Sequence, residues 1–123
     1  MKKTNQPLVY SCSGCSQVAQ LANRIAVHLD RNDVAEMSCI AGIGGQVKAI
    51  MRLAQSGRPL LAIDGCPLRC VQKSLNRIGV TESHHLLLSD FGLKKRQHEE
   101  YSDADVKHFS DLIKSDIIPL ISL

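Results

Sequence analysis

The sequence predicts an α/β protein with a parallel sheet covered by helices on both faces. Short, uniformly apolar runs of strand length alternate with longer segments whose apolar residues recur every three or four positions. Such runs are typical of strands buried on both faces, because half-exposed strands alternate apolar with polar residues. Four of these strand–helix units occupy 123 residues. That length suits one ordinary core, so we expect a single domain over residues 1–123.

The first two units cover residues 8–54. A strand is predicted over residues 8–11, and the helix after it carries its apolar face on Val18, Leu21, Ala22, Ile25, Ala26 and Leu29. A second strand is predicted over residues 36–41, followed by a glycine-rich loop at residues 42–45. This loop lacks the lysine and hydroxyl of a phosphate-binding loop, which favours a tight turn. The next helix is striped by Val47, Ile50, Met51 and Ala54.

The third and fourth units repeat the plan. A buried strand over residues 60–63 leads through Asp64-Gly65 to a helix with Pro67 in its first turn and Gly79 as its cap. A fourth strand is predicted over residues 86–88, and a polar loop follows it over residues 89–101. Ser102 then caps a last helix, which Pro119 ends or kinks. The inner faces of the two helices carry Leu68, Val71, Leu75 and Ile78, and then Val106, Phe109, Leu112, Ile113 and Ile117.

Right-handed crossovers leave few ways to connect these units. We expect a three-layer, flavodoxin-like or Rossmann-like domain with strand order 2-1-3-4. Sites in such sheets form at the carboxyl ends of the strands, where the strand order reverses. That point lies between the first and third strands.

The five cysteines follow the predicted strands. Cys12 and Cys15 come after the first strand, Cys39 lies at the end of the second, and Cys66 and Cys70 come after the third. All five would therefore lie at one edge of the sheet, which predicts a thiolate site. Two close pairs can supply the four sulfurs of a tetrahedral Zn²⁺ site. Spacing i, i+4 would place Cys66 and Cys70 on one side of a first helical turn. Cys12, Cys15 and Cys66 each lie just before or within the first turn of a predicted helix, and the N–H groups there favour the thiolate form.

Other residues near this edge are expected to support or complete the site. For Cys39 three roles remain open: a fifth ligand, a resolving thiol, or a residue packed at the strand end. Asp64 and Gly65 are expected to support the loop, with Asp64 accepting N–H bonds. His84 and His85 precede the predicted fourth strand. They are therefore expected at the opposite end of the sheet, without a ligand role.

Composition and patterning limit the classes of partner. Aromatic residues make up 3% of the chain and tryptophan is absent, which argues against the stacking surfaces of nucleic-acid binders. No apolar segment is long enough to span a bilayer, and the start lacks a secretory core. We expect a cytoplasmic protein whose thiols stay reduced and serve metal or redox chemistry. The sequence indicates neither a protein partner nor an oligomeric state.

The cysteine motifs also resemble those of a known family. The stretches Cys12-Ser-Gly-Cys15, Met37-Ser-Cys-Ile-Ala-Gly-Ile-Gly44 and Asp64-Gly65-Cys66 with Cys70, together with Phe91-Gly92-Leu93-Lys94-Lys95, are similar to the DGC-domain family of zinc-binding proteins. This resemblance covers nearly the whole chain. It implies a zinc site with Cys12, Cys15, Cys66 and Cys70 as the chelating residues.

Three functional hypotheses follow from the residues and the resemblance. The first is a zinc-binding protein with a cysteine-thiolate site. The second is a thiol-dependent redox or sulfur-transfer enzyme that uses the same cysteines. The third is an iron–sulfur protein, because four cysteinates also suit that cofactor. The sequence assigns no catalytic residue and does not decide whether the protein is an enzyme.

Overall fold

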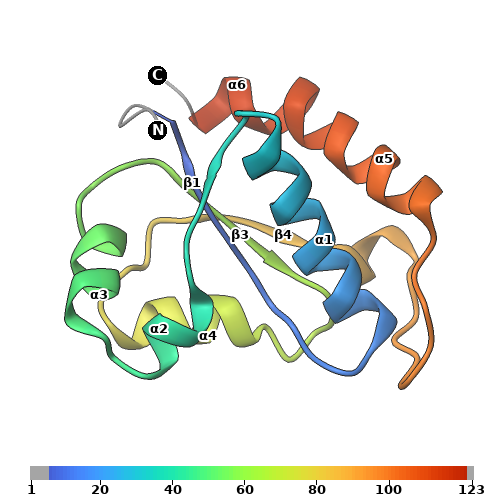
Figure 1. Cartoon of the computed structure of the whole chain (residues 1–123), viewed down its shortest axis with the longest axis horizontal. Helices are drawn as coiled ribbons and strands as arrows, with labels where there is room; N and C mark the ends of the chain where they lie inside the picture. Colours follow the sequence, from blue (N-terminus) through green and yellow to red (C-terminus); the bar gives the residue numbers. More distant parts are fainter. Residues whose placement is uncertain (1–5, 122–123) are drawn as a thin grey trace.

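The computed structural model describes residues 6–121. Its sheet contains four parallel strands in the order β2-β1-β3-β4, which confirms the predicted class and strand order (Figure 1). Leu8 in the first strand pairs with Glu36 and Leu60, and Leu61 pairs with His84. The strands are β1 (Leu8–Ser11), β2 (Glu36–Met37), β3 (Leu60–Asp64) and β4 (His84–Leu87).

Helices cover both faces of this sheet and give three layers (Figure 1). Alternate strand residues face opposite ways. Val9 and Leu61 therefore pack under α1 and α5, whereas Leu8 and Ala62 pack against α2, α3 and α4. The helices are α1 (Gln17–Arg31), α2 (Ile40–Gly44), α3 (Lys48–Ala54), α4 (Cys70–Arg77), α5 (Asp103–Leu112) and α6 (Ile118–Ile121), with a 3₁₀ turn over Leu88–Phe91 and a π-helical turn over Ile113–Ile117.

The second strand is shorter than predicted. It ends at Met37, and the predicted extension over residues 38–41 is wrong because the chain enters α2 at Ile40. Ile40 and Ile43 are spaced i, i+3, so a helical turn lets both pack against one core cluster. The glycines expected in a loop belong to this turn. A Cβ at Gly42 would lie 2.8 Å from Ile50 Cγ1, so glycine allows α2 and α3 to approach each other closely.

The fourth strand and the helix after the third strand also differ from prediction. Strand β4 begins at His84, two residues before the predicted start, and Leu88 already belongs to the 3₁₀ turn. Helix α4 begins at Cys70 and not near Pro67, because Arg69 adopts a left-handed conformation with φ 55°. Gly79 follows this helix with φ 83° and donates its N–H to the Asn76 carbonyl, as a helix-ending glycine does.

The last helix changes type before Pro119. Ser102 caps α5 as predicted, its hydroxyl accepting the Asp105 N–H at 3.1 Å. Further along, the Ile118 N–H bonds to the Ile113 carbonyl, which is a π-helical turn. Pro119 has no N–H to continue the α-helical pattern. The helix therefore widens into a π-helical turn just before Pro119 and does not end there, since helical structure continues to Ile121.

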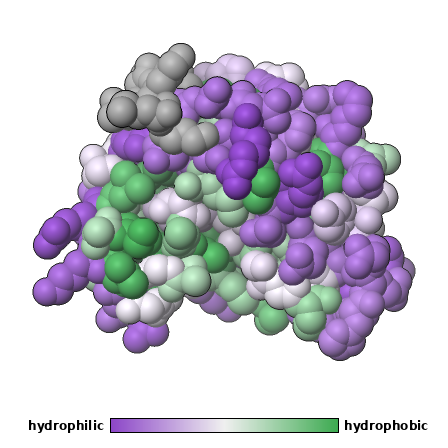
Figure 2. Space-filling model, in the orientation of Figure 1, coloured by the Kyte–Doolittle hydropathy of each residue, from purple (hydrophilic) through white to green (hydrophobic). Residues whose placement is uncertain are grey.

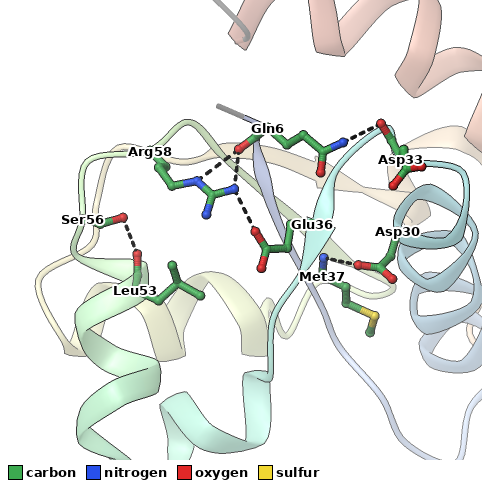
Figure 3. Close-up of polar contacts among 8 residues, drawn as sticks. All are labelled: Gln6, Asp30, Asp33, Glu36, Met37, Leu53, Ser56 and Arg58. Atoms are coloured by element: carbon green, nitrogen blue, oxygen red, sulfur yellow. Dashed lines mark hydrogen bonds and ion pairs between the residues drawn. The ribbon is translucent and has the colours of Figure 1, made fainter. Parts of the chain in front are cut away.

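Polar contacts tie the β2 edge to the rest of the sheet (Figure 3). Arg58 donates to the Gln6 carbonyl at 2.7 Å and to Glu36 Oε1 at 3.0 Å. On the other side, Asp30 Oδ1 accepts the Met37 N–H at 2.9 Å. These bonds help to hold β2, which pairs with β1 through Glu36 and Met37 alone.

Apolar side chains gather over the side of α3 on the face shown in Figure 2, while the surface above α1 and α5 is mainly hydrophilic. Val47, just before α3, is half exposed. Within residues 6–121, no helix combines the length and apolar character needed to cross a membrane.

Candidate thiol site

Four of the five cysteines line one cavity of about 180 Å³, which we call the thiol pocket. Cys12 and Cys15 reach it from the turn between β1 and α1, and Cys66 and Cys70 from the turn between β3 and α4. Both turns lie at the carboxyl edge of the sheet (Figure 1). Asp64, Leu68 and Lys95 also line this pocket.

The first turn is placed by the sheet and by a helix cap. The Cys12 N–H donates to the Ile63 carbonyl at 3.0 Å and so continues the ladder between β1 and β3. Ser16 caps α1, its hydroxyl accepting the Ala19 N–H at 3.2 Å. Cys15 therefore lies immediately before a helix start, exposed to solvent.

Gly65 allows the second turn to lie against α1. A Cβ at this position would be 2.7 Å from the carbonyl carbon and oxygen of Val18, closer than such contacts occur. The Gly65 N–H donates to Cys12 Sγ at 3.2 Å and joins the two turns. The Asp-Gly-Cys sequence thus needs glycine at its centre because of a close backbone approach.

Asp64 anchors the second turn from inside the protein. Its residue surface is 1% exposed, and its carboxylate accepts the Val71 N–H at 2.9 Å and the Gln72 N–H at 3.2 Å. These are N–H groups of the first turn of α4, a helix whose N-cap residue makes no side-chain cap bond. Asp64 therefore caps α4 although it lies six residues before the helix begins. With the contact to His85, its carboxylate takes part in three hydrogen bonds.

His85 is the residue that sequence reasoning missed. Its Nε2 lies 2.8 Å from Asp64 Oδ2, so the expectation that it lies at the far end of the sheet is wrong. The reason is the early start of β4, which pairs His85 with Ala62 and puts its ring on the face covered by α4. A predicted fourth strand that began at His84 would have placed His85 beside Asp64 on the same face of the sheet.

Burial raises the pKa of the Cys12 thiol from 9.0 to about 11, and the neighbouring Asp64, Cys66 and Cys70 add to the rise. The hydrogen bond from Gly65 opposes it. Cys12 is therefore a neutral thiol near pH 7. The expectation that a helix N-terminus favours thiolate here is wrong, because α1 begins five positions later, at Gln17.

Residues 94–98 pair with the start of α1, and Lys95 of this segment lines the thiol pocket. Cys15 Sγ donates to Gln97 Oε1 at 2.6 Å, and the His98 N–H donates to the Cys15 carbonyl at 3.0 Å. The buried Gln17 side chain accepts the Arg96 N–H at 2.5 Å and donates to the Lys94 carbonyl. This pairing over some 80 residues of sequence carries Lys95 to the pocket, and no local pattern predicts it.

The cysteines differ in their surroundings. Cys39 does not line the thiol pocket but a separate cavity beside β2. Cys66 lies in the turn ahead of α4, so its predicted place on the first helical turn with Cys70 is wrong. All five cysteines are free thiols. Within residues 6–121, no three histidine, cysteine, aspartate or glutamate side chains lie close enough together to hold a metal ion.

This combination defines a class of protein: an α/β domain with paired cysteines after its first strand and Asp-Gly-Cys after its third. Residues 8–113 match the DGC domain, and the chain belongs to that family. It is 58% identical over 101 residues to the anaerobic and virulence modulator AnvM of Pseudomonas aeruginosa, a stretch that covers 82% of this chain and 77% of AnvM. No solved structure is a significant match.

Proposed function

We propose that the thiol pocket binds one Zn²⁺ through Cys12, Cys15, Cys66 and Cys70. The observation that carries this proposal is the meeting of four thiols, two from each of two turns, at one small cavity. Zinc takes four thiolate sulfurs at ~2.3 Å in structural sites. The four side chains supply the donors, and binding would draw the sulfurs closer together than they now lie.

The surroundings of the four cysteines fit a thiolate site. Cys15 and Cys70 are exposed, so their side chains can turn inward without breaking the core. Cys12 already accepts the Gly65 N–H, the kind of bond that stabilises a metal-bound sulfur. Zinc would displace the proton that burial keeps on Cys12.

The residues around the pocket have supporting roles. His85 and the N–H groups of α4 engage Asp64, which keeps this carboxylate as an anchor of the turn. Four thiolates around one Zn²⁺ leave a net negative charge, which the Lys95 ammonium at the pocket partly offsets. With every position taken by sulfur, bound zinc would serve structure or sensing, because hydrolytic sites keep one position open.

A zinc titration of the reduced protein tests the proposal. Wild type should bind about one Zn²⁺ per chain in competition with a chromophoric chelator. Cys66→Ser should weaken the affinity at least about tenfold, because three thiolates remain. Cys39→Ser is the matched control and should bind as wild type does. Equal affinity of the Cys66 and Cys39 variants would refute the proposed ligand set.

The same preparation decides between zinc and an iron–sulfur cluster. Protein purified without oxygen should be colourless if zinc is the ligand. A brown protein, with the visible absorption of sulfur-to-iron charge transfer, would instead show that the same four cysteines hold an iron–sulfur cluster.

A second candidate function is thiol–disulfide exchange at the thiol pocket. It is favoured by the exposure of Cys15 and Cys70, each close in sequence to a less exposed cysteine, and by the name of AnvM, an anaerobic modulator. An exposed thiolate would attack a substrate disulfide, and the nearby cysteine would resolve the mixed disulfide and release the second thiol. Peptide mapping of oxidised, metal-free protein should then find Cys12–Cys15 or Cys66–Cys70 disulfides; free thiols throughout would exclude this function.

A further inference from the structure

A second cavity, of about 420 Å³, opens beside Cys39; it adjoins the thiol pocket at Ser13, which lines both, but shares no cysteine with it. We call it the Cys39 cavity. It lies between the carboxyl ends of β1 and β2 and the side of α1, from which Asn23, Asp30 and Arg31 line it. Its volume lies in the range of small-molecule sites. Cys39 is exposed and precedes α2 without making a side-chain cap bond.

Ser11 gives this cavity a polar group that the fold does not use. Its residue surface is 2% exposed, and its hydroxyl has no hydrogen-bond partner within the described part of the chain. Strand alternation puts its side chain on the α1 side of the sheet with Val9, the side from which Asn23 and Asp30 line the cavity. Buried hydroxyls are normally satisfied, so one without a partner at a cavity indicates a ligand.

Charged and polar groups on the α1 side indicate what kind of ligand fits. Asp30 is buried, accepts the Met37 N–H at 2.9 Å (Figure 3) and pairs with Arg31. The Arg31 side chain remains 68% exposed at the cavity, where its guanidinium can contact a carboxylate. Ser38 and Asn23 add a hydroxyl and an amide, groups that suit peptide bonds.

We propose that the Cys39 cavity binds a low-molecular-weight disulfide of the glutathione class, a small peptide that carries carboxylates, and that Cys39 forms a mixed disulfide with it. Cys39 is the cysteine that lines this cavity. Its thiolate attacks one sulfur of the ligand, the ligand's S–S bond breaks, and a bond between Cys39 and that sulfur forms. The other half leaves as a thiolate, which takes up the proton that Cys39 released. One disulfide is consumed and one formed, so no further oxidant is required.

The test compares two reagents on reduced protein freed of metal by a chelator. Glutathione disulfide probes recognition, and iodoacetamide reports the general reactivity of each thiol. Differential alkylation with peptide mapping gives an initial rate for every cysteine with each reagent. We expect the ratio of the glutathione disulfide rate to the iodoacetamide rate to be at least about tenfold higher at Cys39 than at the exposed Cys15 and Cys70, because the cavity of Cys39 is larger than the thiol pocket and holds the Arg31 and Ser11 side chains that would orient the ligand.

Two variants separate recognition from reactivity. Arg31→Gln and Ser11→Ala should each lower the Cys39 ratio several-fold and leave its iodoacetamide rate unchanged. Arg24→Gln, an exposed arginine of the same helix that does not line the cavity, is the matched control and should leave the ratio as in wild type. Equal ratios at Cys39, Cys15 and Cys70, or a Cys39 ratio that neither variant changes, would overturn the proposal. This result is independent of zinc binding, because the two sites share no cysteine.

Discussion

Asp64 and His85 form a hydrogen-bonded pair beneath the thiol pocket, with side-chain exposures of 2% and 12%. A buried carboxylate is stable only when its oxygens are engaged, and here His85 and two N–H groups of α4 engage them. The pair therefore links β3, β4 and α4 at the edge of the sheet where the cysteines meet.

Replacing His85 tests how much this pair contributes to the stability of the fold. His85→Leu should lower the free energy of unfolding by about 1–3 kcal/mol, because it leaves a buried acceptor with one partner fewer. Urea denaturation measures this difference. His84→Leu is the matched control, since His84 precedes it in the same strand and is not part of this pair, and its effect should stay within about 0.5 kcal/mol. Equal losses in the two variants would show that the bond to Asp64 contributes little.

The raised pKa of Cys12 predicts a distinct pH dependence. The thiol keeps its proton in the folded protein up to a pKa of about 11, whereas its ordinary value is 9.0. Only the thiolate is alkylated, so in reduced, metal-free protein the Cys12 rate should be the slowest in the thiol pocket and still rise between about pH 9 and pH 11. Because the unfolded chain loses this proton first, folding stability should fall over the same interval.

Mapping of iodoacetamide adducts against pH gives the Cys12 profile. A Cys12 rate that levels off below pH 9 would show that burial does not control this thiol. In that case Cys12 would return as a candidate attacking group for thiol–disulfide exchange.

At the scale of elements, the site depends on the close approach of α1 to the turn between β3 and α4. Gly65 lies against the backbone of Val18, where no side chain fits. On the other side, residues 93–98 pair with the start of α1 through Gln17 and Cys15. The thiol pocket therefore lies between the two cysteine turns, with Lys95 at its side, and the close approach at Gly65 and the hydrogen bonds of Gln17 and Cys15 fix how far apart these segments lie.

Gly65→Ala should destabilise the protein by about 1–3 kcal/mol, because the added methyl group overlaps the Val18 backbone and one element must shift. Gly44→Ala is the matched control: a Cβ there meets no atom within 4 Å, and α2 gains helix propensity. Its stability should be unchanged or up to about 1 kcal/mol higher. Thermal unfolding of both variants measures the difference, and a harmless Gly65→Ala would mean that the two elements are not tightly packed.

At the scale of the whole molecule, two aliphatic core clusters hold the sheet between its helices. One lies under α1 and α5 and includes the buried Phe109, and the other lies under α2, α3 and α4 and includes the buried Tyr10. Burial of apolar area stabilises a fold by roughly 25 cal/mol per Å². Cys12 packs against both clusters, but none of their buried members is a cysteine, so neither core depends on the proposed zinc ligands.

Removal of metal should therefore leave the fold in place. Protein treated with a chelator under reducing conditions should keep most of its far-UV circular dichroism and unfold cooperatively on heating. A shift of the melting temperature on adding Zn²⁺ would report binding to the folded state. Loss of helical signal in the chelated protein would instead make the metal site a requirement for folding, as in zinc fingers.

Much of the fold can be predicted from the sequence because its signals are local. The spacing of Val18, Leu21 and Ile25 identifies α1, and the uniformly apolar runs before Cys12 and Asp64 identify the central strands. Predictions failed where local signals compete. Residues 38–41 are apolar enough to extend the second strand, yet Ile40 packs with Ile43 in a helical turn. The fourth strand begins with two histidines, so its start lacks an apolar signal.

For this protein, the sequence by itself determined the α/β class, the strand order and the meeting of two cysteine pairs at one edge, because hydrophobic periodicity and crossover handedness act along the chain. Only the tertiary structure decided that Cys39 lies in another cavity, that His85 bonds to Asp64, and that residues 93–98 bring Lys95 to the thiols. The physical reason is that these contacts join residues far apart in sequence. Their distances are set by the packing of whole elements, which no local pattern records.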